Sequence, residues 1–189
     1  LKIMRSIHFA LLGGLSLLLT ACGDGGRLTS EPRTLDMIVK EAGIPPEGAT
    51  MVIKRLSDDF SWVMNSERAE WEYPPASTAK IPHLLIALEL GYAEPETNFV
   101  WDGQPRLIDV WNEDQTLTSA FQRSAVWVFQ RITTDLGPEV MADQLKNLNY
   151  GNGDVGTPED ITLYWLVGPL GITAKQQVAF LERYIEGEL

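Results

Sequence analysis

The stretch YPPASTAKIPHLLIALEL, residues 73–90, holds a serine and a lysine three residues apart. That spacing places Ser77 and Lys80 on one face of a helical turn, where a hydroxyl beside an amine is a candidate nucleophile and base. Apolar residues after Lys80 recur at helical spacing, so the turn leads into a helix that should end at Gly91. Because Pro82 has no N–H to donate to the preceding turn, that turn is expected to be tighter than the helix.

This pair of residues carries little weight alone. An S-x-x-K match is expected about once by chance in a chain of ordinary composition and this length. A serine after two prolines is commonly a helix cap, and a lysine in a first helical turn is commonly a solvated charge. Other parts of the chain must therefore point to the same two side chains before a function follows.

Composition indicates one globular domain with a sizeable core, since 44% of the 189 residues are hydrophobic and 22% are charged. The formal net charge is −11, and no run of lysine or arginine offsets it. Such a surface repels a phosphate backbone, so nucleic acid is excluded as a partner.

Residues 1–22 read as an export signal, with Lys2 and Arg5 before a short apolar run. The run ends in Leu-Thr-Ala-Cys, which resembles the lipobox of bacterial lipoproteins and predicts lipidation of Cys22, the only cysteine of the chain. Gly23 after it favours the outer membrane, so an exported protein on the periplasmic face, held by its lipid alone, is expected. A plain secretory signal remains the alternative. Residues 23–34 read as a flexible tether.

Apolar spacing and helix-start residues predict further elements in the domain that begins near Leu35. Thr116, Ser124 and Thr173 are expected to cap helices, Thr173 with Gln176 in a capping box. The Gly- and Pro-rich segment 150–168 is expected to be a long functional loop with a short ordered piece around Trp165. Helices are expected at 35–42, 116–122, from 124, from 138 and at 173–185, and a hairpin at 50–54 and 61–64.

Three later features bear on Ser77. Ser124-Ala125-Val126 offers a second hydroxyl at a helix start, Tyr150-Gly151-Asn152 opens the long loop, and Trp165 precedes Gly-Pro-Leu. Taken singly, they are a helix cap, a helix end and a core tryptophan. Their order in the chain is what relates them to the Ser77 turn.

In that order the motifs resemble class D serine β-lactamases, the oxacillinase type, over about residues 48–189. The matching residues are PAST-x-KIP at 75–82, IALE at 86–89, WDG at 101, SAV at 124, YGN at 150 and WLxGPLxIT from 165. The resemblance implies an α/β (α+β) fold of the serine β-lactamase and transpeptidase type, an antiparallel sheet packed with helices beside a helical lobe. Two departures are Ala79, where the family commonly has an aromatic, and His83, where it commonly has an amide. We interpret His83 as a residue of the helix surface or rim.

The resemblance implies a β-lactam substrate and assigns a role to each matching residue. Ser77 would be the acylated nucleophile, and Lys80 the general base as an N-carboxylated lysine. That carbamate needs carbon dioxide but no other cofactor and no metal. An amine in an apolar pocket loses its charge, and only the neutral amine captures carbon dioxide. Trp165 would donate its indole N–H to the carbamate.

The remaining motif residues would support this chemistry. Ser124 would relay a proton to the leaving nitrogen, and Val126 would wall the lysine from water. Tyr150 and Asn152 belong to the pocket without an assigned step, and a purely structural role for them stays open.

Several alternatives stay open. A class A enzyme would have S-D-N where this chain has Ser124-Ala125-Val126, and a class C enzyme has no counterpart of Trp165. A penicillin-sensing or penicillin-binding domain of the same fold would be acylated without turnover. A non-catalytic lipoprotein that binds cell-wall peptide would form no covalent adduct. The family contains monomers and dimers, so the oligomeric state is undetermined.

The family's K-[ST]-G motif is missing from the printed residues, because the six lysines are followed by Ile, Glu, Arg, Ile, Asn and Gln. That motif supplies the substrate carboxylate site on a strand. Residues 35–189 are therefore expected to be a C-terminally truncated β-lactamase/transpeptidase-like domain of a longer protein, with an incomplete sheet and no activity of its own.

Overall fold

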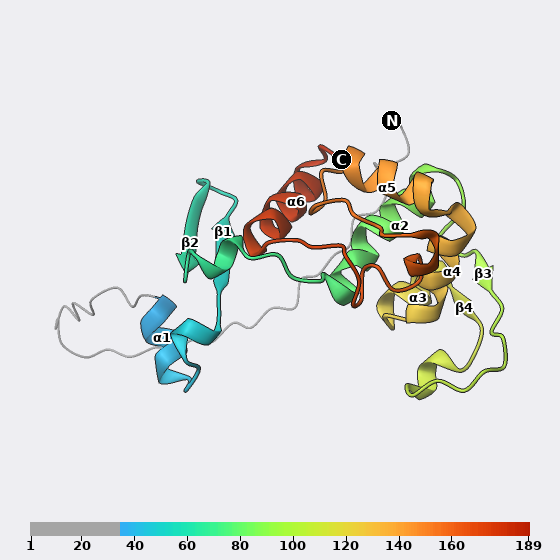
Figure 1. The fold of residues 1–189 in the computed structure, drawn as a ribbon, viewed down its shortest axis with the longest axis horizontal. Helices are drawn as coiled ribbons and strands as arrows, with labels where there is room; N and C mark the ends of the chain where they lie inside the picture. The colour runs from blue at the N-terminus through green and yellow to red at the C-terminus, as the bar shows by residue number, and fades with distance from the viewer. Residues whose placement is uncertain (1–34) are drawn as a thin grey trace, which may run out of the picture. The chain divides into compact units, whose positions relative to one another are not determined.

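The computed structural model describes residues 35–189, so the predicted signal, Cys22 and the tether at 23–34 lie outside the described part and stay predictions. No helix within 35–189 is long and apolar enough to cross a membrane. Figure 1 shows the elements in chain order. They are α1 (Leu35–Glu41), η1 (Pro46–Gly48), β1 (Met51–Arg55), β2 (Phe60–Met64), η2 (Arg68–Glu70), η3 (Ala76–Ala79), α2 (Lys80–Glu89), β3 (Asn98–Phe99), η4 (Asp109–Trp111), β4 (Gln115–Thr116), α3 (Leu117–Gln122), α4 (Val126–Leu136), α5 (Pro138–Asn147), η5 (Pro158–Asp160) and α6 (Ala174–Glu186).

The helices α2 to α5 form a lobe around one hydrophobic core, in which α4 packs against α2, α3 and α5. The apolar side chains at helical spacing in α4 and α5 are completely buried there. Burial of this stripe removes apolar area from water and stabilises the lobe. The core side chains at this contact are Ile86, Val128, Phe129, Ile132, Met141 and Leu145.

The predicted hairpin is present, with β1 and β2 antiparallel and Met51 opposite Met64. Helix α6 lies beside β1 (Figure 1), and Lys54 of β1 donates to Glu182 of α6 at 2.8 Å. A second two-stranded antiparallel ladder joins β3 and β4. Helices beside a small, incomplete antiparallel sheet are the architecture that the sequence predicted.

Apolar side chains remain on the surface of the hairpin, where Phe60 is 50% exposed and Trp62 is 37% exposed. Helix α1 forms as predicted, although its Ile38 is exposed and Val39 is the side chain that it buries. Both observations agree with a sheet whose apolar surface is only partly covered.

Two of the three predicted helix caps are confirmed. Thr116 and Thr173 each accept a hydrogen bond from the backbone of the third helical residue and form capping boxes, with Ser119 and Gln176 respectively. The prediction that Ser124 caps α4 is wrong, because Ala125 is the N-cap residue and makes no side-chain cap. The Ser124 side chain is thereby free for the contact with Ser77 described below.

Candidate active site

Ser77 lies in the 3₁₀ turn η3, directly before α2 begins at Lys80, so the predicted tight turn is confirmed. The turn is fixed from outside, because the Ala76 N–H donates to the Trp165 carbonyl at 2.8 Å. Ala76 has a φ of +48°, a left-handed conformation that costs a non-glycine residue about 1–3 kcal/mol. The strained backbone at Ala76 and its hydrogen bond thus hold the exposed Ser77 side chain in a defined position.

Lys80 is the buried partner of this serine. Its side chain is only 1% exposed, and its Nζ lies 2.9 Å from Ser77 Oγ. The Nζ atom also lies 4.7 Å from the ring centroid of Trp165 and 5.8 Å from that of Phe129. Burial lowers the pKa of Lys80 from 10.5 to about 8. The lower pKa leaves a larger share of the amine neutral at pH 7 than in an exposed lysine, so the amine can act as a base or a nucleophile.

Ser124 comes to the same point from the α3–α4 connection. Its Oγ donates to Ser77 Oγ at 3.2 Å, and its φ of +54° is again left-handed. The structure therefore brings Ser77, Lys80 and Ser124 together, although 47 residues separate the two serines. Val126 is half-buried at the start of α4 and packs against the core, and its predicted role as a wall for the lysine stays a prediction.

Trp165 supplies an unpaired donor beside the lysine. The indole is completely buried, yet its Nε1 has no hydrogen-bond partner among the described residues. An orphaned buried N–H costs about 1–3 kcal/mol, so such a group points to an acceptor that completes it. A carbamate on Lys80, whose oxygens accept hydrogen bonds, fits this requirement.

His83 is where the sequence interpretation is wrong. We expected a surface or rim residue, but the ring is completely buried, and its Nε2 is 2.7 Å from the Tyr164 hydroxyl. Burial and the nearby charge of Lys80 lower the His83 pKa to about 3, which keeps the ring neutral. The spacing of three from Lys80 already places His83 on the same helical face, and that signal could have identified it.

Tyr150 is linked to the Ser77 turn through Gln177, a residue that the sequence did not indicate. Its hydroxyl donates to Gln177 Oε1 at 3.1 Å, and Thr78 Oγ1, next to Ser77, donates to the same oxygen at 3.2 Å. The Tyr150 ring is completely buried against Phe180. The Tyr150 side chain therefore supports the Ser77 turn through Gln177 of α6 and does not contact Ser77 itself.

Asn152 joins chain segments and makes no contact with the serines. Its Nδ2 donates to Glu72 and to the Pro169 carbonyl, and its Oδ1 accepts from the Gly171 N–H at 3.1 Å. The next residue, Ile172, pairs with Tyr73, four residues before Ser77. The structural reading of Tyr150 and Asn152 is the one that these contacts favour.

Gly151 between them lies against Gly171. With a φ of +57°, it would place an added Cβ only 2.2 Å from the Gly171 carbonyl oxygen. We expect Gly151→Ala to lower the free energy of unfolding by about 3 kcal/mol or more, because backbone must move. Gly91→Ala is the matched control, since Gly91 has a φ of +63° with nothing within 4 Å and should lose about 1 kcal/mol. Urea unfolding compares the two, and equal losses would contradict the close contact.

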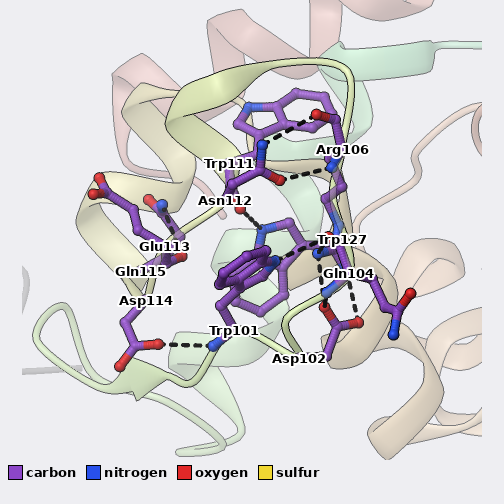
Figure 2. A network of polar contacts seen from close by, with 10 residues as sticks. All are labelled: Trp101, Asp102, Gln104, Arg106, Trp111, Asn112, Glu113, Asp114, Gln115 and Trp127. Carbon is purple, nitrogen blue, oxygen red and sulfur yellow. Dashed lines mark hydrogen bonds and ion pairs between the residues drawn. The ribbon is translucent and has the colours of Figure 1, made fainter.

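A network of polar contacts links the 101–115 segment to Trp127 of α4 (Figure 2). Arg106 pairs with Asp102 at 2.8 Å and lies over the Trp127 ring of α4. The Trp127 indole donates to the Trp111 carbonyl, while the Trp111 indole donates to the carbonyl of Arg123, the residue before Ser124. These contacts hold both ends of the turn that positions Ser124.

No group of three or more His, Cys, Asp or Glu side chains that could hold a metal ion occurs within residues 35–189. The groups that meet at the site are two hydroxyls, an amine and a buried indole. They have the chemistry needed to form an ester on Ser77 and to accept its proton.

Comparison with protein families gives one match that spans most of the chain. The family described as the penicillin binding protein transpeptidase domain matches residues 46–189. This range includes every motif residue of the site.

The chain is also similar to curated relatives and solved structures that are class D β-lactamases. β-Lactamase OXA-10 of Pseudomonas aeruginosa is 47% identical over 76% of this chain and 53% of its own length, and OXA-20 is 39% identical over 76% and 54%. The chain thus spans about half the length of these relatives. The class D β-lactamase YbXI from Nostoc superposes with a TM-score of 0.77 at 36% identity, over 82% of this chain and 64% of that one. A class D enzyme from Bacillus subtilis gives 0.73 at 33% identity, over 84% and 64%. These neighbours confirm the predicted fold.

Proposed function

Because the chain belongs to the penicillin binding protein transpeptidase family and is similar to class D β-lactamases, we propose that the protein hydrolyses β-lactams through an acyl-enzyme on Ser77. The observation that supports this most is the contact of 2.9 Å between Ser77 Oγ and the buried Lys80 Nζ. A serine hydroxyl needs an adjacent base to become a nucleophile, and burial makes this lysine one.

In the acylation step, Ser77 Oγ attacks the β-lactam carbonyl, and the C–N bond of the ring breaks. The proton of Ser77 leaves toward the base carried by Lys80, which lies next to it. Ser124, 3.2 Å from Ser77 Oγ, is placed to pass a proton to the ring nitrogen as it departs. Water must then be activated to hydrolyse the ester, and this second step separates a hydrolase from an acylated sensor.

We propose that Lys80 works as its carbamate. When bound there, carbon dioxide supplies an anionic oxygen base at neutral pH in place of an amine. Two properties of this chain support it: the lowered pKa of Lys80, which leaves the amine free to react, and the Trp165 N–H, which lacks an acceptor. Burial of Lys80 removes the water that would solvate the competing ammonium.

This proposal predicts a steep pH dependence. Below pH 8, the pKa of Lys80, conversion of the ammonium to the carbamate releases two protons, one on deprotonation and one on capture of carbon dioxide. At fixed dissolved carbon dioxide, the carbamate fraction should therefore fall by up to about 100-fold per pH unit. Turnover is measured against dissolved carbon dioxide at pH 7.0, 6.5 and 6.0. The half-saturating concentration of carbon dioxide should rise with each step down in pH. A concentration that does not change with pH would contradict the carbamate.

The function itself is tested on the protein in its natural full length. A chromogenic cephalosporin and intact-protein mass spectrometry are followed in the same reaction. Continued colour release with a transient adduct on Ser77 supports hydrolysis. One equivalent of product with a lasting adduct would favour the sensor or penicillin-binding alternative. No adduct at any time would favour a non-catalytic cell-wall-binding lipoprotein.

A further inference from the structure

A second layer of buried groups lies behind the lysine. His83 is one helical turn after Lys80, its ring packs edge-on against Trp165 with centroids 5.3 Å apart, and its Nε2 meets the Tyr164 hydroxyl at 2.7 Å. All three side chains are completely buried. A polar cluster in such a place is costly to assemble unless its members are paired, so each unpaired atom in it is informative.

The hydrogen bond to Tyr164 sets the tautomer of His83. The pKa of the phenol is raised by burial, so it stays protonated and can donate to His83 Nε2. If His83 donated instead, both the phenol proton and the Nδ1 lone pair would lack partners. The tautomer that leaves fewer buried groups without a hydrogen-bond partner carries the proton of the neutral ring on Nδ1.

His83 Nδ1 is then a buried N–H without a partner within residues 35–189, as is Trp165 Nε1. These two unpaired donors belong to rings in contact with each other, and Lys80 Nζ lies 4.7 Å from the centroid of one of them. Two donors and no acceptor suit a pocket built for an anion with two oxygens, which a carbamate provides.

We propose that His83, with its tautomer set by Tyr164, is a positioning residue for the carbamate of Lys80: it holds the Trp165 indole beside the lysine and adds a second N–H donor to the pocket. The inference rests on the proposed function, since it concerns the same base. It gives a reason for a buried imidazole at a position that we had interpreted as surface.

The test measures carbamate formation directly, without turnover. The full-length protein and its variants are titrated with ¹³C-labelled carbon dioxide, and the carbamate signal, assigned by its loss in Lys80→Ala, is followed by NMR. His83→Phe keeps a ring against Trp165 but has no N–H, and should weaken carbon dioxide binding by about 10- to 100-fold, since it loses a hydrogen bond to a charged group. His83→Asn retains a donor and should stay within about threefold of wild type.

Tyr164→Phe provides a second comparison in which His83 is unchanged. Loss of its hydroxyl frees the tautomer, and about a fivefold weakening is expected. Equal carbon dioxide affinity in wild type, His83→Phe and Tyr164→Phe would overturn the inference while leaving the proposed function intact. Equal weakening in His83→Phe and His83→Asn would also overturn it, because the N–H donor would then not matter. A wild type that shows no carbamate signal would instead refute the proposed base.

Discussion

Replacing Ser77 by alanine is expected to abolish the covalent adduct with penicillin and to lower turnover by about 10⁴-fold or more, since the nucleophile is lost. The Ser77 side chain is exposed, and the turn is held by the Ala76 backbone, so the fold should survive. Intact-protein mass spectrometry after incubation with penicillin gives the measurement. A persisting adduct in this variant would remove Ser77 from its role.

Two further serine variants make the result specific. Ser66→Ala removes an exposed hydroxyl outside the site and should leave adduct formation unchanged. Ser124→Ala removes the hydroxyl that donates to Ser77 Oγ, so acylation should slow while the adduct still forms. An adduct that is lost in Ser124→Ala and kept in Ser77→Ala would exchange the assignments of nucleophile and relay.

The second large effect is expected for Trp165→Phe, which keeps a smaller aromatic ring near Lys80 Nζ and removes the unpaired N–H. Loss of one such preorganised donor costs about 100- to 1000-fold. Deacylation should suffer more than acylation, because hydrolysis of the ester depends on a base to activate water. The acyl-enzyme should therefore accumulate. Single-turnover mass spectrometry over time separates the two rates.

Trp127→Phe is the matched control. It also deletes the N–H of a buried indole, but one whose partner is the Trp111 carbonyl, in the network that braces the α3–α4 turn. A loss of about 1 kcal/mol in stability is expected, with the carbon dioxide dependence unchanged. Unaltered deacylation in Trp165→Phe would show that another group serves the base.

Much of the local structure followed from the sequence. The tight turn at Ser77, the helix that stops just before Gly91, the cap at Thr116 and the capping box of Thr173 are all confirmed. Each depends on contacts between residues only three or four apart, so the residue types within one turn suffice to predict it. The identity of the motif residues likewise indicated the family that the comparison found.

Contacts between distant segments decided the rest. Ser124 has the residue type of a helix cap, but a left-handed backbone turns it toward Ser77, and packing of the α3–α4 connection imposes that conformation. His83 is buried because Tyr164, 81 residues later, covers its helical face. The pKa of Lys80 is lowered because packing against other segments excludes water around it. Spacing along the chain was enough to propose Ser77 as the nucleophile with Lys80 beside it. The lowered pKa of that lysine and the N–H donors around it arise only when distant segments pack together.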